Sequence, residues 1–365
     1  MAHKPLTEIQ IEGFTSIRSA RVRLGQLNVL VGANGSGKSN FIQAFGLLGR
    51  IVDEELGLFV GLNGGASALL NDTAARIKLD LHAESNAYEA VLVAAANDEL
   101  IFEQEVVYYQ GEGHPRPWNL VVGKGNRETR LHEEAERQPG RVAAHVLELL
   151  RGCRVYHFHD TSADAPVKQL VPTADNISLR YDAGNLAAVL LALQESDRAA
   201  YRRIVGAIQL VAPFFRDFVL RPETGDRLRL RWQQQGSDTI FSANQMSDGT
   251  LRFVCLATLL LQPQLPALVV LDEPELGLHP FAIVQLAGLL KQAAVRSQVL
   301  IATQSVTLMN QFAIDDLIVV ERVDGVSTFD RPDPDRFRNW LDEYSLGELW
   351  EKNLIGGRPG EGSSS

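Results

Sequence analysis

The chain has 365 residues, of which 45% are apolar and 22% charged, which is typical of a soluble globular protein with one large or two modest domains. No apolar run approaches transmembrane length and no secretory signal opens the chain, so we expect a cytoplasmic protein without a membrane partner. Cys153 and Cys255 lie in apolar stretches, which favours buried thiols in a reducing compartment. The net charge of −10 argues against broad, sequence-independent coating of nucleic acid, although a local basic groove is compatible with it.

The first 31 residues predict three short strands, at 6–12, 20–24 and 27–31, with turns between them. The third strand runs into Gly32-Ala33-Asn34-Gly35-Ser36-Gly37-Lys38-Ser39, and a helix-like run follows at 40–48. This G-x-x-x-x-G-K-[ST] pattern between a strand and a helix indicates a loop that binds nucleotide phosphates. An ordinary glycine-rich turn is the alternative, and the flanking strand and helix disfavour it.

The residue types of this loop suit phosphate chemistry. Glycines let successive backbone N–H groups curve around a phosphate, and the helix N-terminus adds donors and the positive end of a dipole. Lys38 can reach the β- and γ-phosphates, and the Ser39 hydroxyl can ligate Mg²⁺. The expected nucleotide-binding residues here are Gly32, Asn34, Gly35, Ser36, Gly37, Lys38, Ser39 and Asn40.

A meander of antiparallel strands is predicted next. Residues 53–75 are rich in Gly and Ala with weak periodicity, and Gly61–Gly65 indicates a loop. Strand-like runs follow at 76–83, 88–95 and 100–109, separated by turn-forming pairs such as Ser85-Asn86. Residues 110–130 are rich in Gly and Pro, with a further strand expected at 118–122.

A short helix at 141–150 and a strand at 153–159 come next. His157 and His159 would share a face of that strand, since side chains alternate, and with Asp160 they raise the question of a metal site. No third and fourth ligand follow at a recognisable spacing, so hydrogen-bonded imidazoles at a sheet end are favoured. A nucleotide-sensing loop with Asp160 or Thr161 is the functional alternative.

Helical periodicity covers 184–212 and predicts an amphipathic pair of helices. Two strands are expected at 214–221 and 227–232, and their arginines would alternate onto one exposed face. That face would serve either solubility or contact with a nucleic-acid backbone. The arginines concerned are Arg216, Arg221, Arg227, Arg229 and Arg231.

A second set of candidate residues lies in the C-terminal half. Gln245–Thr250 precedes a strongly apolar helix at 251–261, and a serine and glycine at a helix start can bind an anion. The apolar run 268–271 then ends on Asp272 and Glu273, which predicts a buried strand with carboxylates at its C-terminal edge, where ligands of α/β sheets bind. Asp272 would hold Mg²⁺, and Glu273 would position or deprotonate the attacking water.

The remaining residues complete an α/β core. We expect a helix at 281–295, a core strand at 299–303 that ends at Gln304, and a hairpin of 316–322 and 326–329 around Asp324-Gly325. Short helices are expected at 336–341 and 346–353, and residues 354–365 have the composition of a disordered tail.

Together these motifs resemble the ATP-binding-cassette ATPases, specifically the soluble branch that includes RecF, SMC and OLD-like proteins. Gly32–Ser39 resembles Walker A, Met246–Thr250 the signature, Leu268–Glu273 Walker B and Glu275–His279 the D-loop. The resemblance is strongest over 6–50 and 240–350. It implies an α/β P-loop ATPase head, formed by residues 1–135 and 235–353 and carrying an antiparallel β meander, with a helical and β signature lobe at 136–234.

The resemblance also implies a mechanism. Two heads of this family sandwich two ATP molecules, so Ser247 and Gly249 would contact the γ-phosphate bound to the other protomer. The implied ligands are ATP and Mg²⁺, and the implied assembly is a homodimer that closes on ATP. Gln304 stands where the family usually has a switch histidine and cannot carry its positive charge, so we expect slow hydrolysis, with Glu273 and Gln304 as the catalytic residues.

Two functions remain open at this stage. One is an ATPase acting on DNA in repair, recombination or genome maintenance. The other is an ATP-gated regulator of a partner effector, a nuclease or toxin, in phage defence. A transporter ATPase is disfavoured, because nothing here resembles a transporter-coupling region, and the chain has neither a long coiled coil nor room for a fused nuclease domain.

Overall fold

The computed structural model describes residues 5–111, 117–137, 141–223 and 225–357. The chain divides into two compact units. Unit 1 comprises Met1–Val155, Pro266–Val270 and Ser297–Ser365, and unit 2 comprises Tyr156–Leu265 and Leu271–Arg296. The head-and-lobe division expected from the sequence stays a prediction.

Unit 1 contains a six-stranded antiparallel sheet, in the order β2-β1-β4-β5-β6-β7. The meander predicted from the turn signals is therefore confirmed, and the first two strands join it. Apolar side chains alternate along these strands because one face of the sheet is buried. The strands are β1 (Leu6–Phe14), β2 (Ile17–Arg23), β4 (Arg76–Ala83), β5 (Asn86–Ala94), β6 (Leu100–Tyr109) and β7 (Trp118–Gly123).

The second sheet of the chain has the order β17-β16-β3-β15-β14-β8. β3 pairs in parallel with β15 on one side and with β16 on the other, and β16 forms an antiparallel hairpin with β17. The predicted turn at Asp324-Gly325 is confirmed, with φ of 51° and 80°. The strands are β3 (Leu27–Val31), β8 (Cys153–Tyr156), β14 (Leu268–Asp272), β15 (Gln298–Thr303), β16 (Leu317–Val323) and β17 (Val326–Asp330).

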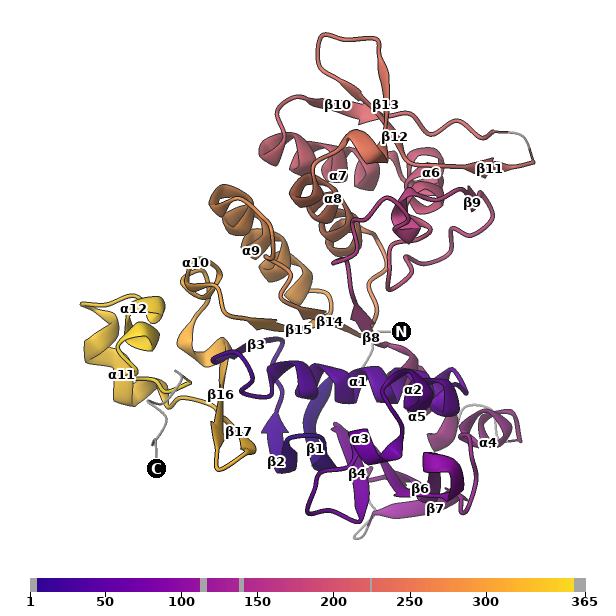
Figure 1. The fold of residues 1–365 in the computed structure, drawn as a ribbon, viewed down its shortest axis with the longest axis vertical. Coiled ribbons are helices and arrows are strands. Elements are labelled where there is room, and N and C mark those ends of the chain that lie inside the picture. Colours follow the sequence, from indigo (N-terminus) through magenta and orange to yellow (C-terminus); the bar gives the residue numbers. More distant parts are fainter. Residues whose placement is uncertain (1–4, 112–116, 138–140, 224, 358–365) are drawn as a thin grey trace. The chain divides into compact units, whose positions relative to one another are not determined.

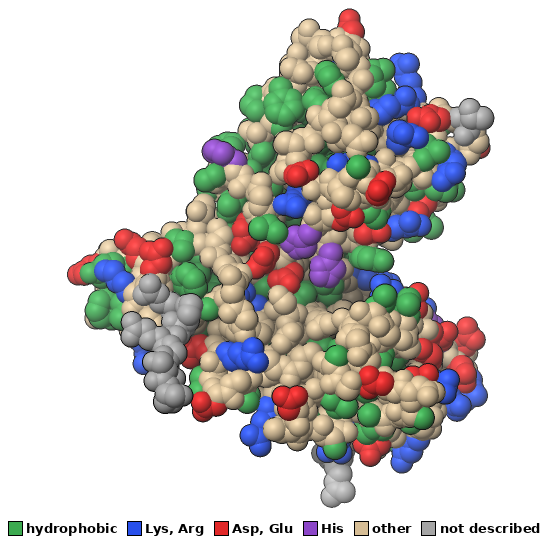
Figure 2. Space-filling model, in the orientation of Figure 1, with side chains coloured by type: hydrophobic (Ala, Val, Ile, Leu, Met, Phe, Trp, Pro, Cys, Tyr) green, Lys and Arg blue, Asp and Glu red, His purple; other side chains and the backbone are tan. Residues whose placement is uncertain are grey.

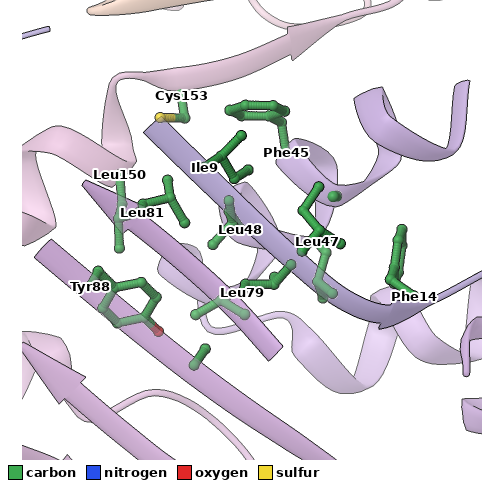
Figure 3. Close-up of a cluster of buried hydrophobic side chains, with 14 of the residues drawn as sticks. Ile9, Phe14, Phe45, Leu47, Leu48, Leu79, Leu81, Tyr88, Leu150 and Cys153 are labelled. Atoms are coloured by element: carbon green, nitrogen blue, oxygen red, sulfur yellow. The ribbon is translucent and has the colours of Figure 1, made fainter. Parts of the chain in front are cut away.

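Helix α1 (Lys38–Val52) lies between the two sheets of unit 1 (Figure 1) and buries side chains on several of its faces. α5 (Val142–Arg151) packs beside α1 and against β5 and β6. Figure 3 shows the resulting core, in which Ile9, Leu79 and Leu81 of the meander meet Phe45 and Leu48 of α1. α1 begins at Lys38, immediately after the phosphate loop.

Several short helices of unit 1 were not predicted. α2 (Leu56–Leu62) and α3 (Ala66–Leu69) flank a turn at 63–65, so that Gly61 and Leu62 of the expected loop are helical, and α4 (Leu131–Arg137) precedes α5. Their periodicity is weak because each spans two turns or fewer. In the C-terminal part α10 (Val306–Met309) was not predicted either, whereas the two short helices expected at 336–341 and 346–353 are confirmed as α11 (Pro334–Leu341) and α12 (Leu346–Glu351). Leu354–Gly357, which the sequence assigned to a disordered tail, are placed in the structure with Ile355 buried, and 358–365 lie outside the described residues.

Unit 2 contains the predicted helical pair, α6 (Leu186–Ser196) and α7 (Arg198–Val211), and two further apolar helices, α8 (Asp248–Leu261) and α9 (Pro280–Ala294). α7 packs against both α8 and α9. Small antiparallel sheets join β10 (Phe215–Phe218), β12 (Arg231–Gln234) and β13 (Ile240–Ser242), and separately β9 (Val171–Pro172) and β11 (Arg227–Leu228). No helix among the described residues has the length and apolarity needed to cross a bilayer.

Two strand predictions were wrong. The expected strand at 153–159 ends at Tyr156, so His157 and His159 do not belong to it. The expected strand at 227–232 divides into β11 and β12, which belong to different sheets. The arginines of that stretch therefore do not alternate along one strand face.

Candidate functional site

The loop Gly32–Gly37 connects buried β3 to α1 in unit 1. Its first glycine lies against β16, and a Cβ on Gly32 would be 2.2 Å from the Val320 carbonyl oxygen. Gly37 has φ of 113°, and a Cβ there would be 2.1 Å from Ser327 Oγ of β17. Neither position has room for a Cβ, because β16 and β17 lie directly against the loop. Both positions therefore require glycine.

Lys38, the first residue of α1, is 4% exposed. Its Nζ donates to the carbonyl oxygens of Gly32 and Ala33, each at 2.8 Å. These bonds hold the ammonium group beside the first two residues of the loop. A phosphate bound in the loop would be within its reach.

Two further features of the loop suit a bound polyphosphate, namely the start of α1 and the hydroxyl of Ser36. The N-cap of α1 is Gly37, which offers no side-chain cap, and the first turn has no acidic residue, so its N–H groups and dipole favour an anion. The hydroxyl of Ser36, which is 4% exposed, is a buried polar atom with no hydrogen-bond partner among the described residues. Asn34, Gly35 and Ser39 are exposed, and Asn40 donates from Nδ2 to Ser16 Oγ at 2.6 Å.

Gln304 lies at the same sheet edge as the loop. Thr303, the last residue of β15, is in register with Val31, the last residue of β3, and the two strands are parallel. Gln304 and Gly32 therefore leave adjacent strands at the same end, where ligands of α/β sheets bind.

A C-terminal segment that is distant in sequence contacts the phosphate loop. The Gly357 carbonyl oxygen accepts from Ala33 N–H at 2.7 Å, and Gly357 N–H donates to Glu321 Oε1 at 2.7 Å. Gly356 and Gly357 have φ of 82° and 80°, conformations that favour glycine. Nothing in the sequence pattern predicted this contact.

The signature-like residues are at the start of α8 in unit 2. Ser247 is exposed and is the N-cap of α8, with Oγ accepting from Thr250 N–H at 3.3 Å. A Cβ on Gly249 would be 2.5 Å from the carbonyl oxygen of Gly277. The close contact with Gly277 of the same chain therefore requires glycine at position 249. The sequence motif alone did not indicate this contact.

The acidic turn, residues 272–278, lies in unit 2 and begins at Asp272, the last residue of β14. Glu273 has φ of 44°, a left-handed conformation that is costly for a residue with a Cβ and that often marks a functional site. A pocket beside it is lined by Asp272, Glu273, His159 and Arg252 together with apolar side chains. Asp272 and Glu273 are half-buried.

Arg252 and His159 hold this turn. Arg252 Nη1 donates to Leu276 O and Nη2 to His159 O, both at 2.9 Å. His159 Nε2 lies 2.9 Å from the carbonyl oxygen of Asp272, and because a carbonyl only accepts, Nε2 carries the proton. Arg252 thus links the signature helix to the acidic turn, a role that sequence reasoning missed because no motif spacing marks it.

His157 and His159 do not form a metal centre in the described parts of the chain. Their ring centroids are 6.4 Å apart, and no group of three His, Cys, Asp or Glu side chains in those parts is arranged to hold a metal. Asp160 accepts from Ser162, and these hydrogen bonds lower the pKa of the Asp160 carboxyl. Its expected sensing role stays a prediction.

Four of the five arginines predicted to form a basic face contact an acidic side chain or a backbone carbonyl. Arg216 lies 3.7 Å from Asp238, and Arg229 and Arg231 lie 3.7 and 3.9 Å from Glu223. Arg227 donates to the carbonyl of Leu170. Figure 2 likewise shows basic and acidic side chains interspersed on the face it presents. These contacts lower the positive charge available to a nucleic acid.

Residues 27–117 and 135–310 match the family model described as "AAA domain, putative AbiEii toxin, Type IV TA system". The chain belongs to this family. Family membership makes it an ABC-type AAA ATPase domain of the nucleotide-using P-loop class. The sequence-level resemblance is therefore confirmed at the level of family and fold.

Solved structures show the same fold. One, the SmcHead bound to the C-winged helix domain of ScpA, is 17% identical with a TM-score of 0.58, covering 92% of this chain and 99% of its own. Another is the Smc head domain with an extended coiled coil bound to the C-terminal domain of ScpA, from Pyrococcus furiosus. It is 14% identical with a TM-score of 0.52, covering 93% of this chain and 99% of its own. No curated protein matches the sequence.

The structure groups the predicted residues in two sets. Unit 1 holds the phosphate loop and Gln304 at one sheet edge, and unit 2 holds Ser247, Gly249, Asp272 and Glu273 around the start of α8 and the acidic turn. Sequence reasoning missed the residues that support each set, namely Ser16, Ser327 and Gly357 for the loop and Arg252 and His159 for the turn.

Proposed function

We propose that this protein binds ATP at Gly32–Asn40 and hydrolyses it slowly. The observation that carries the proposal is the phosphate loop itself, with glycines pressed on the sheet, an uncapped helix start and Lys38 held across its mouth. These groups supply backbone donors and one cation for a polyphosphate.

Ser39 and Asp272 are the proposed ligands of Mg²⁺, by resemblance to Walker A and Walker B. Bound there, the ion would supply positive charge against the phosphate oxygens. Glu273 is the proposed base that accepts the proton of the attacking water. Gln304 is the proposed partner of the γ-phosphate or the water, as a neutral donor and acceptor.

The proposed active assembly is a homodimer closed on ATP, in which Ser247 and Gly249 of one protomer contact the nucleotide of the other. Ser247 is exposed at the start of α8, as such a contact requires. ATP would then bind the closed dimer more tightly than the open protomers. Hydrolysis would allow the closed dimer to open.

Glu273→Gln tests this assembly. The variant keeps the size of the side chain but loses the base, so hydrolysis should fall by about 100-fold or more while ATP binding persists. Light scattering with Mg²⁺ and ATP should then show a dimer that dissociates when nucleotide is removed. A monomer at saturating ATP contradicts the sandwich, and an unchanged hydrolysis rate contradicts the role of Glu273.

The second question is what the ATPase controls. The family description refers to a toxin and a type IV toxin–antitoxin system, which favours the regulator of a partner effector over a DNA-repair enzyme. Arg216, Arg229 and Arg231 lie beside acidic side chains, which also favours the regulator. Hydrolysis measured with and without duplex and single-stranded DNA separates the two: an unchanged rate supports the regulator, and stimulation that is lost on substituting Arg221 and Arg229 by Ala supports the DNA enzyme.

A further inference from the structure

Three polar side chains outside the phosphate loop form a hydrogen-bonded relay beneath it, all in unit 1. Ser327 Oγ on β17 lies 2.6 Å from the Ser36 carbonyl oxygen, and Ser16 Oγ lies 2.7 Å from Ser327 Oγ. Asn40 Nδ2 on α1 lies 2.6 Å from Ser16 Oγ. Ser16 and Ser327 are 9% and 0% exposed, so water cannot replace these bonds freely.

The direction of every bond in this relay follows from counting hydrogens. A carbonyl oxygen only accepts, so the single hydroxyl hydrogen of Ser327 goes to Ser36. Ser16 must then donate its own hydrogen to Ser327, and the Asn40 amide donates to Ser16. The relay therefore runs from Asn40 through Ser16 and Ser327 and ends on the backbone of the phosphate loop.

The end point matters because of peptide geometry. The Ser36 carbonyl and the Gly37 N–H belong to one planar trans peptide and point in opposite directions. A hydroxyl that holds the carbonyl toward β17 fixes the Gly37 N–H toward the other side of the peptide. A Cβ on Gly37 would be 2.1 Å from the same Ser327 Oγ, which shows how closely this part of the loop is applied to β17.

We infer that Ser327 and, through it, Ser16 are positioning residues that fix the direction of the Ser36–Gly37 peptide for phosphate binding. This inference rests on the proposed function, because it concerns the same nucleotide loop. It goes beyond that function in assigning a role to two serines that the loop motif does not contain and that lie 311 residues apart in sequence.

Binding of Mg²⁺ and ATP to wild type, Ser327→Ala and Ser16→Ala, measured by titration calorimetry, tests the inference. Ser327→Ala should weaken binding by about three- to tenfold, because it removes the hydrogen bond that fixes the peptide. Ser16→Ala should weaken it by about twofold, since Ser16 reaches the Ser36 carbonyl only through Ser327. The double variant should bind as Ser327→Ala does, because the two serines act in series. In turnover assays KM should rise with kcat nearly unchanged.

Ser297→Ala is the matched control. Ser297 is also a buried serine of unit 1 and donates to a backbone carbonyl, that of Pro266, but it lies at the opposite end of β15 from Gln304. Its melting temperature should fall about as much as that of Ser327→Ala, while its affinity for ATP stays that of wild type.

The outcomes separate the inference from the proposed function. Wild-type protein that binds no ATP overturns the proposed function itself. Wild-type binding with equal affinity in Ser327→Ala, or an equal loss in Ser297→Ala, overturns the inference alone. If Ser327→Ala does not fold, Ser16→Ala decides the matter: unchanged affinity in a folded Ser16→Ala protein overturns the relay.

Discussion

The phosphate loop of unit 1 and the acidic turn of unit 2 are held in different ways. The loop is fixed by segments distant in sequence, through Ser327, Ser16 and Gly357, and two of its glycines are demanded by the strands beneath. The turn is held by Arg252 and His159, which bind its backbone carbonyls, and it contains Glu273 in a left-handed conformation. The proposed phosphate-binding loop is thus supported by the strands of the sheet, whereas the acidic turn depends on hydrogen bonds from two side chains.

The largest effect should come from Gly37→Ala. The added Cβ meets Ser327 Oγ, and a φ of 113° is unfavourable for alanine, so we expect a loss of about 3 kcal/mol in the free energy of unfolding. Gly35→Ala is the control, because Gly35 has φ of 74° but nothing within 4 Å of the added Cβ, and it should lose only about 1 kcal/mol. Urea unfolding measures both, and equal losses would show that β17 does not constrain the loop.

Arg252→Met should come next, with a loss of about 2 kcal/mol, because two hydrogen bonds from a charged group to backbone carbonyls disappear. Hydrogen exchange should quicken in α8 and in residues 273–278 while α1 keeps its protection. Uniform loss of protection in both units would contradict the local role of Arg252.

Truncation after Leu354 should cost less, about 1 kcal/mol, because the loss of two hydrogen bonds and of the burial of Ile355 is largely offset by the conformational entropy of residues that no longer need to be ordered. Exchange of the Ala33 amide hydrogen should accelerate, since Gly357 accepts from it. An unchanged rate for Ala33 would show that the segment does not close on the loop in solution.

The smallest effect concerns pH. Glu105 in unit 1 is fully buried, and burial raises the pKa of its carboxyl, although hydrogen bonds from Thr129, Arg130 and Tyr88 oppose the shift. Because the folded pKa lies above the unfolded one, the stabilisation from this group is complete below the unfolded pKa and is lost as pH rises through the folded value. The stability of wild type relative to Glu105→Gln should therefore decline as pH rises from about 4 toward neutrality. A difference that stays constant or grows would contradict the raised pKa.

Much of the fold could be predicted because the periodic signals were strong. The meander, the helical pair, the strands around the phosphate loop and the hairpin at Asp324-Gly325 each follow from alternation or turn residues. Short helices such as α2 and α4 were missed because two turns carry little periodicity. The strand expected through His159 was wrong because its apolar alternation continues past the last residue of β8.

The candidate site could be predicted only where residues form a contiguous motif. Gly32–Ser39 and Leu268–Glu273 are such motifs, and each indicates its proposed chemistry within a few residues. Ser16, Ser327 and Arg252 are ordinary residues in sequence, and they gain a role only when folding brings them to the loop or the turn.

The central claim is that the phosphate loop binds ATP, and titration calorimetry of wild type and Lys38→Met with Mg²⁺ and ATP tests it most directly. The account predicts about one ATP per chain for wild type and a loss of affinity of about tenfold or more for Lys38→Met, because the variant keeps the aliphatic bulk but removes the ammonium group. Absence of binding to the folded wild type, or equal affinity in the two proteins, would contradict it.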